Sequence, residues 1–271
     1  MQNFGSRNET EIQFHLNNKR FSLLSNHWKS VFKILYSTET FTFLNKIRRI
    51  KCEKTQDYIK PDIIISFGGE KRYISIKSGR ATNVHTEKIE TFLKFLQELG
   101  VTRKTINTIL LCHYGDGTLD GTGKIRLDWY ELYQKYKDRI LEANDELNDS
   151  TDFVKKVIKR TVFQGVDEKS HMAEYLYFGD QEYGTIVSFN QMNKYIDRKP
   201  HNWDFYENIH IGPIVLRPHG RYAHKQIVSE KRRNEIQCNW PNLHADLDYI
   251  VKRYGYWLKS LLLYLIISCR I

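Results

Sequence analysis

Asp62 and Lys77 are the two residues of this chain whose types and spacing most clearly indicate chemistry. They stand near the two ends of the segment KPDIIISFGGEKRYISIKSG. In this segment the β-branched run 63–65, the glycines 68–69 and the alternating run 73–77 predict a strand, a hairpin turn and a second strand. Pairing of the strands brings Asp62 and Lys77 together, because both lie far from the turn. A carboxylate there can bind a divalent cation, and an ammonium can lie beside a phosphate or an attacking water.

The residues before this hairpin predict helices. Residues 9–24 and 26–37 have helical patterns, and Ser25 or Asn26 is a candidate N-cap for the second. The apolar face of that second helix consists of Trp28, Val31, Phe32, Ile34 and Leu35. A further short helix is expected at 40–50.

A helix and a strand are expected after the hairpin. Residues 86–100 predict an amphipathic helix that Thr86 caps and Gly100 ends. Its buried stripe consists of Ile89, Phe92, Leu93, Leu96 and Leu99. Residues 106–113 (INTILLCH) predict a buried strand. Helix, hairpin, helix and strand form an α/β order, in which the last strand can lie parallel to an earlier one through a right-handed crossover.

The rest of the chain predicts a mixture of elements. Expected helices are 128–147, 152–161 and 243–254, and expected strands are 173–178, 185–189 and 209–216. The polar run 143–152 is the expected junction between a first part, residues 1–150, and a second part, residues 151–271. The two parts form either separate domains or one continuous domain.

In their hairpin context, Asp62 and Lys77 resemble the signature of the PD-(D/E)XK nuclease superfamily. The resemblance covers about residues 25–115. It implies an α/β (α+β) fold, with a restriction-endonuclease-like α-β-β-β-α-β core whose central mixed β-sheet is flanked by helices. It also implies that Asp62 and a second acid bind Mg²⁺, while Lys77 orients or activates the attacking water. Basic single-chain members of this size are often type II restriction endonucleases.

The chain departs from that signature at Ser75, where the second acid would stand two residues before Lys77. One branch of the family has this substitution and carries the carboxylate on the following helix, which makes Glu87 and Glu90 candidates. At 100° per residue, Glu87 points away from the sheet and Glu90 lies at the edge of the buried stripe. We therefore expect Glu90 to complete the metal site, with Ser75 facing it and His85 as a helper or phosphate contact.

Each of these residues also has a structural alternative. Asp62 can simply start a strand, Lys77 can be a solvated strand end, and Glu90 can be a surface glutamate. Glu9 and Glu11 on the first helix are a further possible source of a metal ligand, as early-helix acids are in some relatives.

The glycine-rich loop 115–123 contains Asp116 and Asp120. It lacks the terminal Glu of a calcium loop and the Lys-Ser/Thr ending of a phosphate-binding loop. We therefore expect a turn-rich connector, or a loop that contacts DNA.

The charge of the chain favours a polyanionic partner, with a formal net charge of +10, a pI near 9.3 and a basic excess in both halves. In the segment 217–233, the expected nucleic-acid contacts are Arg217, Arg221, Lys225, Arg232 and Arg233. Such side chains neutralise phosphates, and arginine can bind guanine in the major groove. Candidates for reading adenine edges are Asn202, Asn234, Gln237 and Asn239. The alternative is a solvated basic face.

Cysteine usage and hydropathy bear on location. Cys52, Cys112, Cys238 and Cys269 share no close spacing, which argues against a zinc finger or a disulfide framework and suits a reducing cytoplasm. The first fifteen residues are polar, so no signal peptide is expected. The apolar run 261–267 is too short to span a bilayer, so we expect no membrane partner and read it as a core element or an interface.

Together these features predict a Mg²⁺-dependent, sequence-specific endonuclease of a restriction system that cleaves double-stranded DNA as a homodimer. The alternatives are another nuclease of the same superfamily, in DNA repair or transposition, and a non-catalytic DNA-binding protein. Small-molecule enzymology is disfavoured, since the sequence has no nucleotide-binding loop, nucleophile elbow or redox motif.

Overall fold

The computed structural model describes residues 4–55, 60–78, 82–166, 171–198, 203, 205, 207–218 and 230–254. The chain divides into two compact units, and neither is continuous in sequence. Unit 1 comprises Met1–Ala81, Val162–Tyr195 and Leu243–Ile271, and unit 2 comprises Thr82–Thr161 and Ile196–Asn242. The boundary expected near residue 150 falls inside unit 2.

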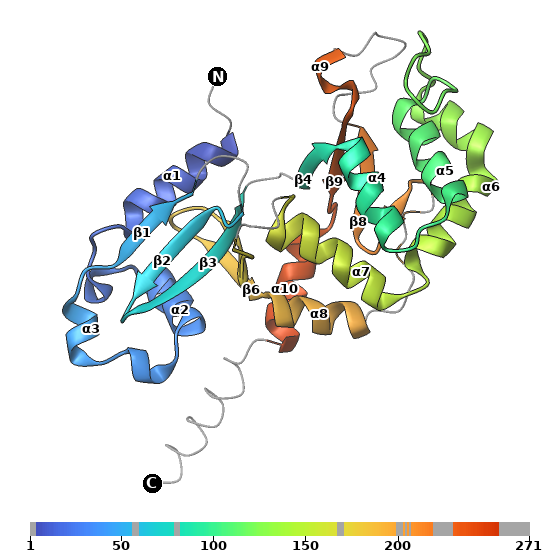
Figure 1. Cartoon of the computed structure of the whole chain (residues 1–271). Helices are drawn as coiled ribbons and strands as arrows, with labels where there is room; N and C mark the ends of the chain where they lie inside the picture. Colours follow the sequence, from blue (N-terminus) through green and yellow to red (C-terminus); the bar gives the residue numbers. More distant parts are fainter. Residues whose placement is uncertain are drawn as a thin grey trace. The chain divides into compact units, whose positions relative to one another are not determined.

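Unit 1 contains a five-stranded mixed sheet in the order β1-β2-β3-β5-β6 (Figure 1). Its strands are β1 Lys51–Lys54, β2 Ile63–Phe67, β3 Glu70–Lys77, β5 Tyr175–Gly179 and β6 Gly184–Ser188. Strands β3 and β5 are parallel, whereas the other neighbours are antiparallel. The expected α/β class, with a mixed sheet flanked by helices, is confirmed.

The helices of unit 1 are α1 Phe4–Leu16, α2 Asn26–Leu35, α3 Phe43–Ile47, most of α8 Phe189–Arg198, and α10 Leu243–Tyr254. Short 3₁₀ turns lie at Phe21–Leu23 and Thr38–Thr40. The expected cap of α2 is present, because the Ser25 side chain accepts a hydrogen bond from the Trp28 amide at 3.3 Å. The apolar faces of α1 and α2 pack with the sheet in one core that includes Leu16, Trp28, Phe32, Ile65, Phe67 and Ile76.

The expected hairpin joins β2 and β3. Gly68 and Gly69 have φ of +60° and +88°, a left-handed region that favours glycine. The register pairs Ile63 with Ile74, which places Asp62 opposite Ser75. Lys77 follows two residues later, on the same face as Ser75.

Unit 2 has a four-stranded antiparallel sheet in the order β4-β9-β8-β7. Its strands are β4 Asn83–Lys88, β7 His210–Ile211, β8 Ile214–Pro218 and β9 Glu235–Asn239. Its helices are α4 Ile89–Glu98, α5 Arg103–Tyr114, α6 Trp129–Asn148, α7 Thr151–Ile158 and α9 Glu230–Arg233. A π-helical stretch, Lys159–Gln164, continues α7, and its residues from Val162 onward belong to unit 1.

Four expected elements are wrong. The helix expected at 9–24 ends at Leu16, and the strand expected at 209–216 is instead the antiparallel pair of β7 and β8. The helix expected at 86–100 begins only at Ile89, because residues 83–88 form β4 and pair with β9. The strand expected at 106–113 is helix α5, which Thr102 caps through the Thr105 amide and Gly115 ends at φ +66°. The strand parallel to β3 is therefore β5, which the chain reaches only after most of unit 2.

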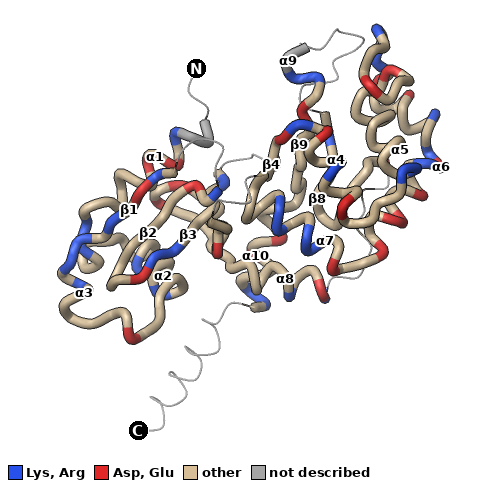
Figure 2. The backbone as a smooth tube through the Cα atoms, viewed as in Figure 1, with Lys and Arg blue, Asp and Glu red and all other residues tan. Residues whose placement is uncertain are grey.

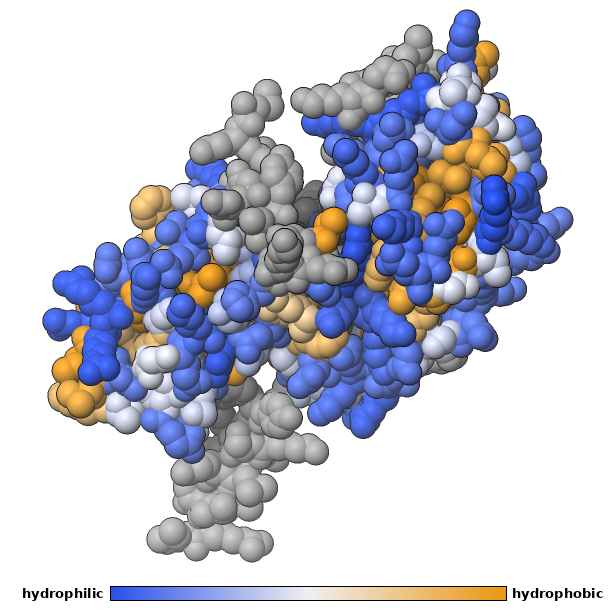
Figure 3. All heavy atoms as spheres, in the orientation of Figure 1, coloured by the Kyte–Doolittle hydropathy of each residue, from blue (hydrophilic) through white to orange (hydrophobic). Residues whose placement is uncertain are grey.

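The surface carries both charged and exposed apolar side chains. Lys and Arg are spread over both units rather than gathered at one end of the chain (Figure 2). Phe43 and Leu44 of α3 are 76% and 60% exposed, and Figure 3 shows apolar surface there. Among the described residues, every helix is too short or too polar to cross a bilayer.

Candidate active site

The Asp62 carboxylate lies at the end of unit 1's central hairpin and is 14% exposed. Its Oδ2 atom accepts hydrogen bonds from the Ile76 amide at 2.5 Å, the Ser75 hydroxyl at 3.0 Å and the Lys60 ammonium at 3.2 Å. These donors come from β3 and from the residues that enter β2. The hairpin register therefore fixes the direction of this carboxylate.

The charge of Asp62 is set by two opposing effects. Burial alone raises its pKa, but Lys60, Lys77 and the Ile76 amide outweigh burial and hold the pKa below its ordinary value. Asp62 is therefore an anion at neutral pH.

Lys77 interacts electrostatically with Asp62, next to which the sequence predicted it to lie. Burial first, and then the neighbouring Lys60 ammonium, lower the pKa of Lys77 to about 8, while Asp62 and Glu9 act in the opposite direction. Lys77 is still mostly protonated at neutral pH, but its proton is held far less tightly than that of a surface lysine.

Glu9 on α1 is the second acid that the structure brings to this site. Its Oε2 atom lies 3.2 Å from the Lys54 ammonium. Burial and the nearby Asp62 carboxylate raise the pKa of Glu9, and the Lys54 and Lys77 ammonium groups only partly offset them. Glu11, the other early-helix acid, instead pairs with Arg7 at the surface at 2.8 Å.

Lys60 is a site residue that the sequence reasoning missed. Its ammonium lies 2.6 Å from the Ser75 hydroxyl, so it bridges Ser75 and Asp62. The available signal was its position directly before Pro61-Asp62, where it enters β2.

We expected Glu87 to lie on a helix and to point away from the sheet. Instead, it lies in strand β4 of unit 2 and is buried. Its carboxylate is 3% exposed and accepts two hydrogen bonds from Arg160, at 3.1 Å and 2.7 Å. His85, on the same strand, contacts it at 3.0 Å. Burial raises the pKa of Glu87, but His85 and Arg160 outweigh burial and lower it. The carboxylate of Glu87 is therefore committed to an ion pair within unit 2.

Glu90 is exposed in the first turn of α4. The expected buried stripe of α4 is confirmed for Ile89, Phe92, Leu93 and Leu96. Because Glu90 belongs to unit 2 and Asp62 to unit 1, its role as a metal ligand stays a prediction.

Few side chains of the described ranges are placed where they could bind a metal ion together. Within them, no group of three or more His, Cys, Asp and Glu side chains is arranged to bind one. Glu9 and Asp62 supply two carboxylates, which fits Mg²⁺, since that ion often takes one or two carboxylates and completes its shell with waters and phosphate oxygens.

The basic residues named from the sequence fall into three groups. Arg217 and Arg232 are exposed. Arg233 donates to the Asp116 carboxylate at 2.7 Å and to the Gly123 carbonyl at 2.6 Å, so it holds the loop 115–123 in place. Arg221 and Lys225 lie outside the described residues. So do Asn202, which was a candidate for reading adenine, and the apolar run 261–267.

No protein-family model matches this chain, and a search of curated proteins finds no match either. Support for a function therefore comes from the fold and from the side chains around Asp62.

Proposed function

We propose that this protein is a Mg²⁺-dependent, sequence-specific endonuclease for double-stranded DNA, of the type II restriction kind. The observation that carries the proposal is the grouping of Glu9, Asp62 and Lys77 in unit 1. Within unit 1, α1, β1, β2 and β3 also follow the α-β-β-β order with which the core of the superfamily that the hairpin resembles begins.

Asp62 and Glu9 would hold the metal ion, with Glu90 as the alternative second carboxylate. When bound, Mg²⁺ polarises the scissile phosphate and lowers the pKa of a water. Ser75 keeps Asp62 oriented through its 3.0 Å hydrogen bond. Lys77, as an ammonium, offsets the negative charge that develops on the phosphate.

The expected partners follow from charge and symmetry. A net charge of +10 suits DNA, and unit 2 exposes Arg217 and Arg232. Cleavage of both strands of a symmetric site favours a homodimer. Cys52, Cys112 and Cys238 are buried and form no disulfide bond, which suits a reducing cytoplasm.

Incubation of the protein with plasmid DNA and Mg²⁺, followed by sequencing of fragment ends, tests this proposal. We expect discrete fragments whose ends share one sequence. Asp62→Asn removes a metal-binding charge and should abolish cutting, whereas Asp138→Asn, on the exposed surface of α6, should cut normally. Absence of cutting with both Mg²⁺ and Mn²⁺ would overturn it.

One observation favours a second candidate, a non-catalytic DNA-binding protein. Ser75 carries no charge, and the Lys60 ammonium lies against both Ser75 and Asp62. In that case the protein binds duplex DNA without cutting it. Smeared or structure-dependent products would instead indicate a nuclease of repair or transposition.

A further inference from the structure

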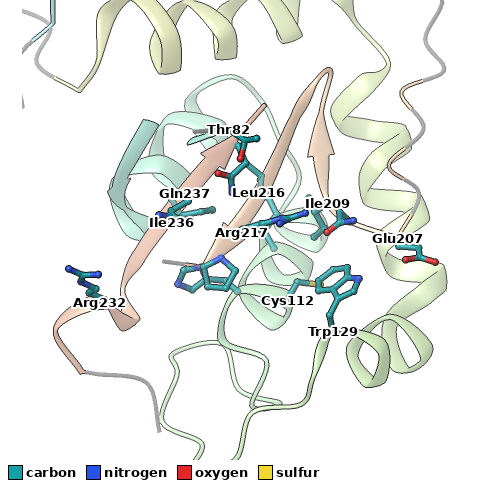
Figure 4. A pocket seen from close by; sticks show the side chains of 15 residues that line it. Thr82, Cys112, Trp129, Glu207, Ile209, Leu216, Arg217, Arg232, Ile236 and Gln237 are labelled. Atoms are coloured by element: carbon teal, nitrogen blue, oxygen red, sulfur yellow. The ribbon is translucent and has the colours of Figure 1, made fainter. Parts of the chain in front are cut away.

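Three polar side chains share one face of strands β8 and β9 in unit 2. Arg217 is the direct cross-strand partner of Gln237, and Asn239 follows two positions along β9. All three line a cavity of about 730 Å³ (Figure 4). Within the described part of the chain, no hydrogen bond uses the side-chain amide of Gln237 or Asn239.

The facing wall of this cavity is largely apolar. Ile109, Cys112 and His113 line it from α5, at a spacing that places them on one helix face. Burial lowers the pKa of His113 to about 4, so this histidine is neutral at physiological pH. Ile209 and Leu216 add further apolar surface.

Trp129, at the start of α6, also lines the cavity (Figure 4). Its indole Nε1 is buried and has no hydrogen-bond partner among the described residues. A buried N–H without an acceptor is costly, and a ligand that carries an acceptor would remove that cost.

These features define the chemistry of a ligand. The apolar wall suits the flat faces of a ring, whereas two free amides suit an edge that carries both donors and acceptors. Asn and Gln pair in this way with a base, and Arg217 and Arg232 can contact a phosphate. The volume lies within the range of pockets that bind small molecules. A nucleobase with its phosphate meets all of these conditions.

We propose that this cavity binds a nucleobase of a nucleotide everted from DNA, an inference that rests on the proposed DNA-binding function. Asn239 is only 7% exposed and lies inside the cavity. A base that remains stacked in a duplex has no route to this amide, whereas an everted base can enter the pocket. A free nucleotide offers the same chemistry, so the test must separate the two sources.

The first arm uses the full-length Asp62→Asn protein, plasmid DNA and chloroacetaldehyde, which modifies unpaired adenine and cytosine. Primer extension should show strong modification at a few discrete positions, where an everted base leaves its partner unpaired. The double variant Gln237→Met/Asn239→Leu, made in the same background, should lose these positions. The control Gln97→Met, at an exposed position of α4, should keep them.

In the second arm, nucleoside monophosphates are added to the unchanged protein and to the Trp129→Phe variant, and the tryptophan fluorescence of each is measured. A change that requires Trp129, and a dissociation constant about tenfold weaker in the double variant, would support a nucleobase site that accepts free nucleotides. Reactive plasmid positions would support eversion. If the plasmid shows no such positions and no nucleotide perturbs Trp129, the inference is wrong, whether or not the protein cuts DNA. Cleavage without either signal would overturn the pocket assignment alone.

Discussion

The ammonium of Lys60 lies 2.6 Å from the hydroxyl of Ser75. Ser75 holds the position at which the second acid of the resembling signature would stand, and Lys60 also reaches Asp62 at 3.2 Å. A tethered cation thus contacts the carboxylate proposed to bind metal. Since two cations near one carboxylate repel each other, Lys60 opposes the binding of a metal ion.

Replacement of Lys60 should therefore strengthen metal binding. We expect Lys60→Met to lower the dissociation constant for Mn²⁺ by about tenfold or more, because it removes a positive charge next to Asp62. Calorimetric titration with Mn²⁺ measures this without reference to cleavage. Lys71→Met, on the exposed part of β3, is the control and should leave the constant unchanged. Equal or weaker binding by Lys60→Met would show that its ammonium does not compete with the metal.

Cleavage by variants of Glu9 and Glu90 can show which of these residues supplies the second metal-binding carboxylate. Glu9→Gln should reduce cleavage by about a hundredfold or more, because it removes the acid that interacts with Asp62. Glu11→Gln, which alters only the exposed pair with Arg7, is the matched control. Single-turnover cleavage rates at saturating Mg²⁺ should separate the two. If Glu90→Gln is inactive while Glu9→Gln cuts normally, the acid comes from α4.

Lys77→Met should abolish cleavage without loss of stability. The pKa of Lys77 is lowered to about 8 chiefly by burial, which shows that its charged form is disfavoured in the folded protein. A methionine of similar length removes that unfavourable charge and keeps the packing. Thermal melting at pH 7 should give a midpoint equal to or above that of the unchanged protein. A markedly lower midpoint would assign Lys77 a structural role instead.

The cleavage rate should depend on the proton of Lys77. Because the pKa is about 8, the ammonium is present below that pH and is lost as pH rises above it. If the ammonium offsets charge on the phosphate, the rate should fall above about pH 8. Single-turnover rates measured over a range of about four pH units centred on that pKa test this. A rate that rises through pH 8 would instead mean that neutral Lys77 accepts a proton from the attacking water.

The hairpin that carries Asp62 and Lys77 was predictable because its determinants are local. The β-branched residues of β2 and the turn at Gly68 and Gly69 act within a few positions of each other. Strand β4 was missed because its partner β9 lies about 150 residues later, and no pattern in 83–88 reveals that pairing.

Helix α5 was missed for a different reason, since its signals were present. The cap at Thr102 and the left-handed Gly115 bound it, but the expectation of a strand rested on the apolar run 106–113 alone. The contact between Lys60 and Ser75 could not be read from the sequence, because it depends on side-chain direction at the hairpin's open end.

The buried ion pair of Glu87 and Arg160 should stabilise unit 2. Arg160→Met should lower the free energy of unfolding by about 3–5 kcal/mol, because it leaves the Glu87 carboxylate buried without its main cation. The double variant Glu87→Met/Arg160→Met should be less destabilised than that single variant, since no unpaired charge remains. Urea denaturation measures both, and Lys104→Met, which breaks an exposed pair with Glu142, should cost less than about 1 kcal/mol.

This ion pair also predicts an acid response. The pKa of Glu87 is below its ordinary value in the folded protein, so the unfolded chain binds more protons as the pH falls below about 4.5. The stability that Glu87 contributes is therefore complete above that pH and is lost as the pH falls through the lower, folded-state pKa. Urea midpoints at decreasing pH should fall less steeply for the double variant than for the unchanged protein. Equal slopes would mean that Glu87 is not an acid-sensitive contact of this fold.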